Sequence, residues 1–232
     1  MSELKRVNDI YDTYPKEKDL SYRWSSLNKG NQYIEKEIIT LITSLFKTHK
    51  IKIRNKKILD VGCAGGDTVR LLKNLGGLEK NISGIDIRKS RLNQTRKLYP
   101  KANIVYMDAR NLKFKNNEFD LICIFTVFTS ILKPINRKKV SNEITRVLKP
   151  GGVILYYDLR YNNPFNKNIK AIRRKEIDVL FPNMIKSIHS MTLIPPIARR
   201  LGNFTKFFYP FLSRQKTFRS HYGGIIIKED IY

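Results

Sequence analysis

The stretch ILDVGCAGGDTVRLL, residues 58–72, constrains the fold more than any other part of the sequence. An apolar run ending in an acid meets a bend of small residues, after which apolar side chains recur at helical spacing. A strand, a glycine-rich bend and a helix in this order let a ligand approach the backbone closely, and the helix N-terminus supplies amide donors. The pattern therefore predicts an α/β fold with a ligand at this bend.

The alternation of strand and helix continues as far as Asp158. The runs that read as strands are KILDVG, NISGID, NIVYMD, FDLICIFTVF and VILYYD, and segments with helical spacing precede and separate them. The fourth run is almost entirely apolar, which is typical of a strand buried on both faces. We therefore predict a doubly wound, mostly parallel sheet whose ligand lies at the carboxyl ends of its strands.

Beyond Asp158 the pattern is mixed. Apolar residues within 177–181 fall on one helical face, and residues 188–194 read as a further strand. The segment HYGGIIIKED reads as the last strand, which we expect to pair antiparallel within the main sheet and to complete seven strands. Between these two strands lies a basic and aromatic insert at about residues 195–216.

Length and cysteine content narrow the class of protein. A chain of 232 residues is long enough for one α/β domain and short for two. Its two cysteines, Cys63 and Cys123, form no framework, so we expect a reduced, cytoplasmic protein without a metal. The N-terminus is charged throughout and no window of ~18 residues is uniformly apolar, so we expect neither a secretory signal nor a membrane span.

The net charge of +25 admits three interpretations. It could be a solvated surface that reflects a compositional bias, an attraction to an anionic substrate or to the inner face of an anionic membrane, or a nucleic-acid surface. Because the charge is spread over the whole chain and no basic arm stands out, we favour the first and rate nucleic-acid binding lowest. Peripheral membrane contact stays open.

Two cofactor classes use a glycine bend of this kind. A dinucleotide prefers G-x-G-x-x-G, and here Gly62, Ala64 and Asp67 occupy the three positions. An acid at the third position would face a pyrophosphate unfavourably. S-adenosylmethionine has no phosphate and carries a positive sulfonium, so acids such as Asp60 and Asp67 are compatible with it. The charge pattern favours S-adenosylmethionine.

The sequence ILDVGCAGGDT resembles the first motif of class I S-adenosylmethionine-dependent methyltransferases, with Ala64 at a position where the family usually has glycine. GIDI resembles the second motif and YMDAR the third, while FDLICIFTVF and LKPGGVILYYD resemble the fourth strand and the turn and strand that follow. The resemblance implies an enzyme with a Rossmann-like methyltransferase fold. It also implies that Asp86 binds the ribose hydroxyls and that Asp108 and Ala109 meet the adenine.

We expect residues 1–30 to cover the cofactor and residues 31–232 to form the methyltransferase domain. The cofactor-binding residues that we predict are Tyr22, Arg23, Asp60, Gly62, Cys63, Ala64, Gly66, Asp86, Ile87, Asp108, Ala109, Arg110 and Phe125. Several of the acids could instead cap a helix or a turn, and Cys63 is better explained as a small bend residue than as a nucleophile.

Methyl transfer from a sulfonium is an in-line displacement, in which orientation and exclusion of water supply much of the rate. An oxygen acceptor of high pKa also needs a base, whereas an amine can do without one. Our candidate catalytic residues are Asp158 at the end of the fifth strand and His221 before the last, with His189 a weaker choice. Asp158 could equally pair with Arg160, and His221 could be a simple strand-end histidine. No carboxylates cluster near Asp158, so we expect no metal.

Segments outside the shared motifs, among them YRWSSLNKGN, YYDLRYNNPFNKN and SHYGGIIIK, resemble bacterial methyltransferases of surface-polysaccharide and other glycan gene clusters. This resemblance implies O-methylation of a sugar on a lipid-linked or nucleotide-linked glycan in polysaccharide biosynthesis. The insert at 195–216 fits a lid or a contact with an anionic membrane. A helix that packs Leu201, Phe204, Phe207 and Phe208 inward explains the insert equally well.

Two alternatives remain. One is O- or N-methylation of another small molecule, such as a quinone precursor or a secondary metabolite. The other is a scaffold that binds the cofactor without turnover.

Overall fold

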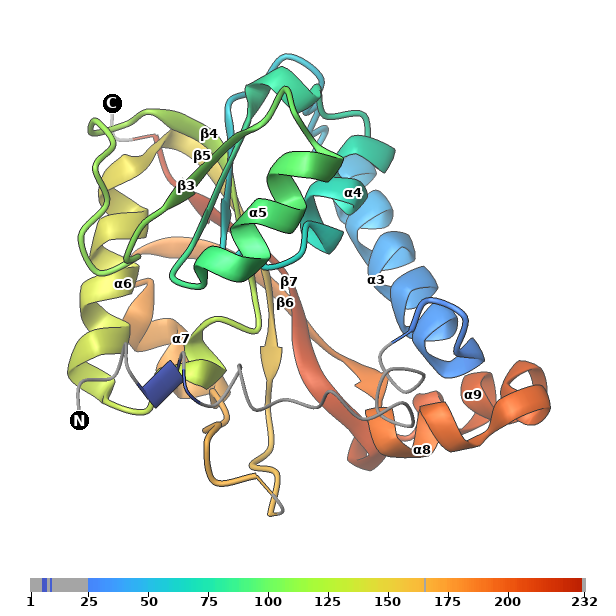
Figure 1. Cartoon of the computed structure of the whole chain (residues 1–232). Coiled ribbons are helices and arrows are strands. Elements are labelled where there is room, and N and C mark those ends of the chain that lie inside the picture. Colours follow the sequence, from blue (N-terminus) through green and yellow to red (C-terminus); the bar gives the residue numbers. More distant parts are fainter. Residues whose placement is uncertain (1–5, 8, 10–24, 165, 231–232) are drawn as a thin grey trace.

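Seven strands form one sheet in the order β3-β2-β1-β4-β5-β7-β6, with helices on both faces (Figure 1). The computed structural model describes residues 6–7, 9, 25–164 and 166–230. The strands are β1 (Ile58–Val61), β2 (Ile82–Asp86), β3 (Asn103–Tyr106), β4 (Phe119–Phe125), β5 (Leu148–Leu159), β6 (Met184–Leu193) and β7 (Arg219–Lys228). The helices include α3 (Lys29–Thr48), α4 (Asp67–Asn74), α5 (Lys89–Leu98), α6 (Pro134–Val147), α7 (Arg174–Leu180), α8 (Pro195–Arg200) and α9 (Thr205–Arg214).

The direction of the strands confirms the predicted fold class. β1 pairs in parallel with β2 and β4, β2 with β3, and β4 with β5. β7 runs antiparallel to both β5 and β6. The sheet is therefore mostly parallel with an antiparallel last strand, as the sequence predicted, and the carboxyl ends of β1 to β6 lie at one edge.

Two apolar layers sandwich the sheet. On one face Leu59, Val61 and Ile122 pack with α6 and α7. On the other, Ile58 and Cys123 pack with α3 and α4. Because successive strand residues point to opposite faces, the continuous apolar run of β4 supplies both layers, and this explains why it lacks polar alternation.

The boundaries of three elements differ from the prediction. α3 begins at Lys29 because the side chain of Asn28 accepts hydrogen bonds from the amides of Gly30 and Asn31 and caps the helix. β5 begins at Leu148, so it includes the LKPGG stretch that reads as a turn; Leu148 pairs with Phe119 and the register then shifts. β6 begins four residues before residue 188, where its side chains are only partly buried and give a weak alternation signal.

The described part of the chain contains no helix that is long and apolar enough to cross a membrane.

Candidate functional site

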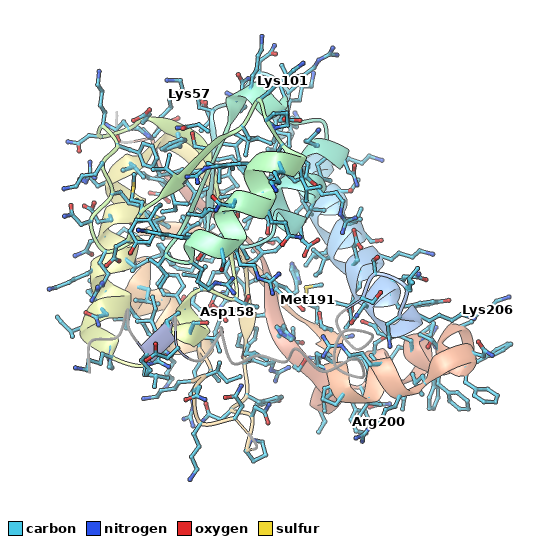
Figure 2. The ribbon with its side chains drawn as sticks, in the orientation of Figure 1. Lys57, Lys101, Asp158, Met191, Arg200 and Lys206 are labelled. Carbon is cyan, nitrogen blue, oxygen red and sulfur yellow. The ribbon has the colours of Figure 1, made fainter. Side chains whose placement is uncertain are left out.

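A cavity lies where the carboxyl ends of β1, β2 and β4 and the loop after β3 meet. Figure 2 marks the two edges of the sheet: Lys57, just before β1, and Lys101, just before β3, lie at one edge, and Asp158, near the end of β5, lies at the other. The predicted residues that line the cavity are Gly62, Ala64, Asp86, Ile87, Asp108, Ala109, Arg110 and Phe125. Its other walls come from Val7, Val61, Ile85, Arg88, Met107, Thr126, Val127, Ser130, Ile131 and Val140.

The glycine bend forms the floor of the cavity. The amides of Gly62 and Cys63 both donate to the carbonyl of Ile85, at 2.8 and 3.0 Å, and tie the bend to β2. Gly62 has a φ of 76°, and a Cβ there would lie 2.9 Å from Val127. Ala64 has a φ of 42°, a conformation that costs an L-residue free energy and suits glycine. Because its residues are small, the bend leaves its backbone atoms accessible to a ligand in the cavity.

Asp86 connects the bend to the second strand. Its Oδ2 accepts from the amide of Ala64 at 2.9 Å, and its Oδ1 accepts from the amide of Arg88 at 2.9 Å. The Nε of Arg88 lies 3.4 Å from the same Oδ1. A carboxylate offers about four acceptor positions, so Asp86 keeps capacity for donors from the cavity.

Asp108 repeats this arrangement one strand further along. Its oxygens accept from the amide of Arg110 at 2.9 Å and from the guanidinium of Arg110 at 2.6 to 3.1 Å. Burial opposes ionisation of Asp108, but the hydrogen bonds from Arg110 outweigh it and hold the pKa of Asp108 below its ordinary value. Asp86 and Asp108 therefore present two anchored acids to one cavity.

Asp60 is the second-last residue of β1, just before the bend; it is buried and does not line the cavity. Within the described residues, neither of its carboxylate oxygens has a hydrogen-bond partner. Burial, with a smaller contribution from the charge of Asp86, raises its pKa well above the ordinary value. A buried acid without a donor is rare in a folded protein and indicates that a ligand or a water supplies the missing hydrogen bonds.

The other residues predicted at the bend lie outside the cavity wall. Burial raises the pKa of the Cys63 thiol, so Cys63 is a packing residue beneath the bend and a poor nucleophile. Gly66 has a φ of 94°, and a Cβ there would lie 2.7 Å from the ring of Tyr99. Asp67 does not line the cavity, and its side chain is 94% exposed beside Arg70.

The first thirty residues are described only in part. Tyr22 and Arg23, which we predicted to cover the cofactor, lie outside the described residues. Val7 lines the cavity, and the neighbouring Arg6 donates to the carbonyls of Ser130 and Asn168.

Asp158 is fully buried and does not line the cavity. Its carboxylate accepts from the amides of Thr129 and Leu159, at 3.2 and 3.0 Å. Burial raises its pKa to about 7, and the backbone donors only partly offset this. The ion pair with Arg160 that we considered does not form, because that guanidinium donates instead to the carbonyl of Lys216 and the hydroxyl of Tyr161.

His221 lies on the opposite face of the sheet from Asp158. In the β5–β7 register Asp158 pairs with Tyr222 and Leu159 with His221, and adjacent residues of a strand face opposite sides. The two candidate catalytic residues therefore cannot act on one group together. His221 also does not line the cavity, but a row of aromatic rings connects the cavity wall to His221. The ring centre of Phe125, in the wall, lies 5.6 Å from that of Tyr157, and the Tyr157 ring stacks on the His221 ring with 4.5 Å between their centres.

Hydrogen bonding defines the state of the His221 ring. The hydroxyl of Ser220 lies 3.1 Å from the carbonyl of Thr192 and 2.8 Å from Nδ1 of His221. Both contacts are hydrogen bonds only if the hydroxyl donates to the carbonyl and Nδ1–H donates to the hydroxyl, which leaves Nε2 as an acceptor. Burial, and secondarily the charge of Arg199, lowers the pKa of His221 to about 3, so the ring is neutral. His189 is exposed and contacts Ser187.

Our sequence reasoning missed Arg88, although a signal was present. Asp86-Ile87-Arg88 and Asp108-Ala109-Arg110 share the pattern D-x-R at the ends of adjacent strands. In both, the arginine two residues on donates to its acid through the backbone amide and the guanidinium. Among the described residues no cluster of three His, Cys, Asp or Glu side chains could hold a metal ion.

Residues 58–152 match a family model described as a methyltransferase domain. An uncharacterized protein of Methanocaldococcus jannaschii is 28% identical over 174 residues, which are 72% of this chain and 60% of that protein. The phthiotriol/phenolphthiotriol dimycocerosates methyltransferase 1 of Mycobacterium ulcerans is 29% identical over 183 residues, 72% of this chain and 64% of that protein. The chain therefore spans less than two thirds of the length of these curated relatives.

A solved structure with the same fold is the geranyl diphosphate C-methyltransferase of Streptomyces coelicolor, in complex with Mg²⁺, geranyl diphosphate and S-adenosyl-L-homocysteine. It is 12% identical, has a TM-score of 0.65, and the match covers 100% of this chain and 98% of that one. At this identity the likeness concerns the fold alone.

Proposed function

We propose that the whole chain transfers a methyl group from S-adenosylmethionine to a small-molecule acceptor, and the premise is the methyltransferase domain whose family model residues 58–152 match. The enzyme class and the methyl donor predicted from the sequence are thereby confirmed at the level of the domain. The acceptor, the site residues and the activity of the whole chain are the subject of the proposal.

The observation that carries the proposal is the pair of anchored acids around a bare backbone bend. Asp86 keeps acceptor capacity on Oδ2 for a ribose hydroxyl, and Asp108 with Ala109 offers an acid and a small residue for an adenine ring. The unpartnered oxygens of Asp60 lie behind the same bend and fit a ligand with a cationic amino group. S-adenosylmethionine, when bound, supplies an electrophilic methyl group on a sulfonium.

The residues of the chain would then position the acceptor and exclude water. Phe125, Val127 and Ile131 give the cavity an apolar wall beside the end of β4. A dry wall strengthens the electrostatic contacts made by the two acids and keeps water from competing with the acceptor. We also propose that residues 1–30 cover this site, which the placement of Val7 in the wall supports.

For the acceptor hydroxyl we propose His221 as the hydrogen-bond partner. Its Nε2 is an unprotonated acceptor at neutral pH, and the ring adjoins the aromatic row that starts at Phe125. Asp158 has a different role in this proposal. By accepting the amide of Thr129 it holds the loop that contributes Ser130 and Ile131 to the cavity wall, and so positions the wall from the face of the sheet that α6 and α7 cover.

For the chemical class of the acceptor, we propose a hydroxyl of a sugar on a lipid-linked or nucleotide-linked glycan, as in polysaccharide biosynthesis. The support is the resemblance of the segments outside the shared motifs. A second candidate is a hydroxylated lipid or phenol, which the name of the Mycobacterium ulcerans relative favours.

Incubation of the purified chain with radiolabelled S-adenosylmethionine tests the proposal. The acceptor pools are sugar nucleotides, polyprenyl-linked glycans, phenols and hydroxylated lipids, and RNA. We expect label in one of the first three pools, and a large loss of turnover in His221→Ala with S-adenosylhomocysteine affinity retained. Label only in RNA would contradict the small-molecule acceptor, and wild-type turnover in His221→Ala would remove His221 from the reaction.

A further inference from the structure

An aromatic face projects from the helices that follow β6. It consists of Phe204, Phe207, Phe208 and Phe211, whose exposed fractions are 64%, 69%, 48% and 63%. Residues at this spacing share one face of a helix. Single exposed apolar residues are ordinary on protein surfaces, but four phenylalanines gathered on one helical face mark a binding surface.

The orientation of α9 is fixed by its other face. Thr205 and Tyr209 are buried, and the Tyr209 hydroxyl donates to Glu37 of α3 at 2.6 Å. Tyr209 also packs in a cluster with Leu193 and Ala198. The interpretation in which Phe204, Phe207 and Phe208 pack inward is therefore wrong, because the inward side of α9 is already occupied.

Positive charge surrounds the aromatic face. Residues 195–218 contain no Asp or Glu, and Arg200, Lys206, Arg214 and Lys216 are exposed. The Nζ of Lys206 lies 5.9 Å from the ring centre of Phe207. Figure 2 shows Arg200 and Lys206 along the outer side of this helical extension.

The extension lies at the same edge of the sheet as the cavity. β6 and β5 are both antiparallel to β7, so β6 ends at the edge where β5 ends. α8 begins at Pro195, just after the end of β6, and α9 follows at Thr205; in Figure 1 they form the corner of the molecule beneath α3.

We propose that this aromatic face and its basic rim dock on the surface of an anionic lipid bilayer. Phenylalanine rings enter the boundary between headgroups and acyl chains, while Lys and Arg pair with anionic headgroups. Charge complementarity selects a bilayer that carries anionic lipid. The proposal concerns binding alone and does not depend on the proposed methyl transfer.

Vesicle co-sedimentation tests the proposal directly. The full chain is mixed with vesicles of phosphatidylglycerol and phosphatidylcholine or of phosphatidylcholine alone, at low and high salt. We expect binding to the anionic vesicles that weakens with salt, and about a tenfold or greater loss in Phe207→Ser/Phe211→Ser, because each exposed ring contributes apolar area to the contact. The matched control is Ile135→Ser/Val179→Ser, which changes two equally exposed apolar side chains on α6 and α7 and should bind as wild type does.

A fluorescent label reports the depth of the same contact. Both native cysteines are buried, so Phe207→Cys provides a single exposed thiol for an environment-sensitive dye. We expect a blue shift on anionic vesicles and none for a dye at Val179→Cys. The proposal would be overturned if wild type and Phe207→Ser/Phe211→Ser sedimented equally with anionic vesicles, or if the control variant lost as much vesicle binding as Phe207→Ser/Phe211→Ser. It would also be overturned if wild type did not bind vesicles and instead formed a dimer in sedimentation velocity that Phe207→Ser/Phe211→Ser abolishes.

Discussion

Two regions of the molecule are held together by contacts that differ in sequence separation: the part of the sheet around the cavity, and the part formed by β6, β7, α8 and α9, called here the C-terminal side. Around the cavity the two acids are held within neighbouring strands and turns: Asp86 binds Arg88 and Asp108 binds Arg110, each two residues away, and Asp86 also accepts from the amide of Ala64, 22 positions away. On the C-terminal side the contacts join distant parts of the chain, since Glu37 of α3 accepts from Tyr209 across 172 positions. The ligand site thus assembles within its own strands and turns, whereas the C-terminal side depends on α3.

This difference separates two kinds of mutational effect. Substitutions on the C-terminal side should change the free energy of unfolding and leave the affinity for S-adenosylhomocysteine as it is. Substitutions of the acids that face the cavity should do the reverse.

Asp158→Asn should change how stability depends on pH. Burial raises the pKa of Asp158 to about 7 in the folded chain, against an ordinary value of 3.8. Between these two pH values the folded state holds the proton and the unfolded state releases it, so Asp158 makes the protein less stable as pH rises from about 4 to about 7. This contribution amounts to roughly 4 kcal/mol and should be absent in Asp158→Asn.

Urea unfolding of both proteins at pH 4 to 8 measures this difference. Asp120→Asn is the matched control, because hydrogen bonds from Lys57 and Lys149 outweigh burial and lower the pKa of Asp120. The contribution of Asp120 to stability therefore changes mainly below about pH 4, so Asp120→Asn should keep the wild-type slope between pH 4 and 8. Parallel pH curves for wild type and Asp158→Asn would show that Asp158 is ionised throughout.

Glu37→Ala should lower the free energy of unfolding by about 2 kcal/mol, because the Tyr209 hydroxyl and the Thr192 amide lose their acceptor inside the protein. The affinity for S-adenosylhomocysteine should not change. Glu35→Ala on the same helix is the control: its partner Arg70 is 43% exposed, and such surface pairs contribute about 0 to 1 kcal/mol. An equal decrease in the free energy of unfolding in the two variants would show that the contact between Glu37 and Tyr209 does not contribute specifically to stability.

Asp86→Ala should weaken binding of S-adenosylhomocysteine more than tenfold, or about 1.4 kcal/mol, while the protein stays folded. The reason is the loss of the acceptor for the ribose hydroxyls. Isothermal titration measures the affinity, and Asp178→Ala, which removes a 51% exposed acid that pairs with Lys186, serves as the control. Unchanged affinity in Asp86→Ala would refute the assignment to the ribose.

Ala64→Gly should stabilise the protein by about 0.5 to 1 kcal/mol, because it relieves an L-residue with a φ of 42°. Ala171→Gly, at a buried position without positive φ, should have the opposite sign. Thermal unfolding of both variants checks the pair. Destabilisation by Ala64→Gly would mean that the bend tolerates alanine without strain.

The parts of the protein that sequence could predict are those with local causes. The order of strands and helices, the bend and the acids at strand ends all follow from patterns of a few residues, and the sheet and most of the cavity residues agree with them. Arg88 belongs to this class too, because the repeated D-x-R pattern identifies it once its geometry is known.

The rest depends on contacts that sequence patterns do not encode. Nothing local shows that Asp158 and His221 face opposite sides of the sheet, since that depends on the pairing of β5 with β7. The exposure of Phe207 could not be predicted from the sequence either, because α9 has apolar residues on two of its faces. The packing of Tyr209 on Leu193 and Ala198 and its contact with Glu37 decide which of them is buried.

The central claim is that the cavity at the carboxyl ends of β1, β2 and β4 holds S-adenosylmethionine. A crystal structure of the protein soaked with both S-adenosylhomocysteine and NAD tests it most directly. We predict S-adenosylhomocysteine in the cavity, with its ribose hydroxyls on Asp86 and its adenine beside Asp108 and Ala109. NAD seated on the glycine bend, or S-adenosylhomocysteine bound elsewhere, would contradict the claim.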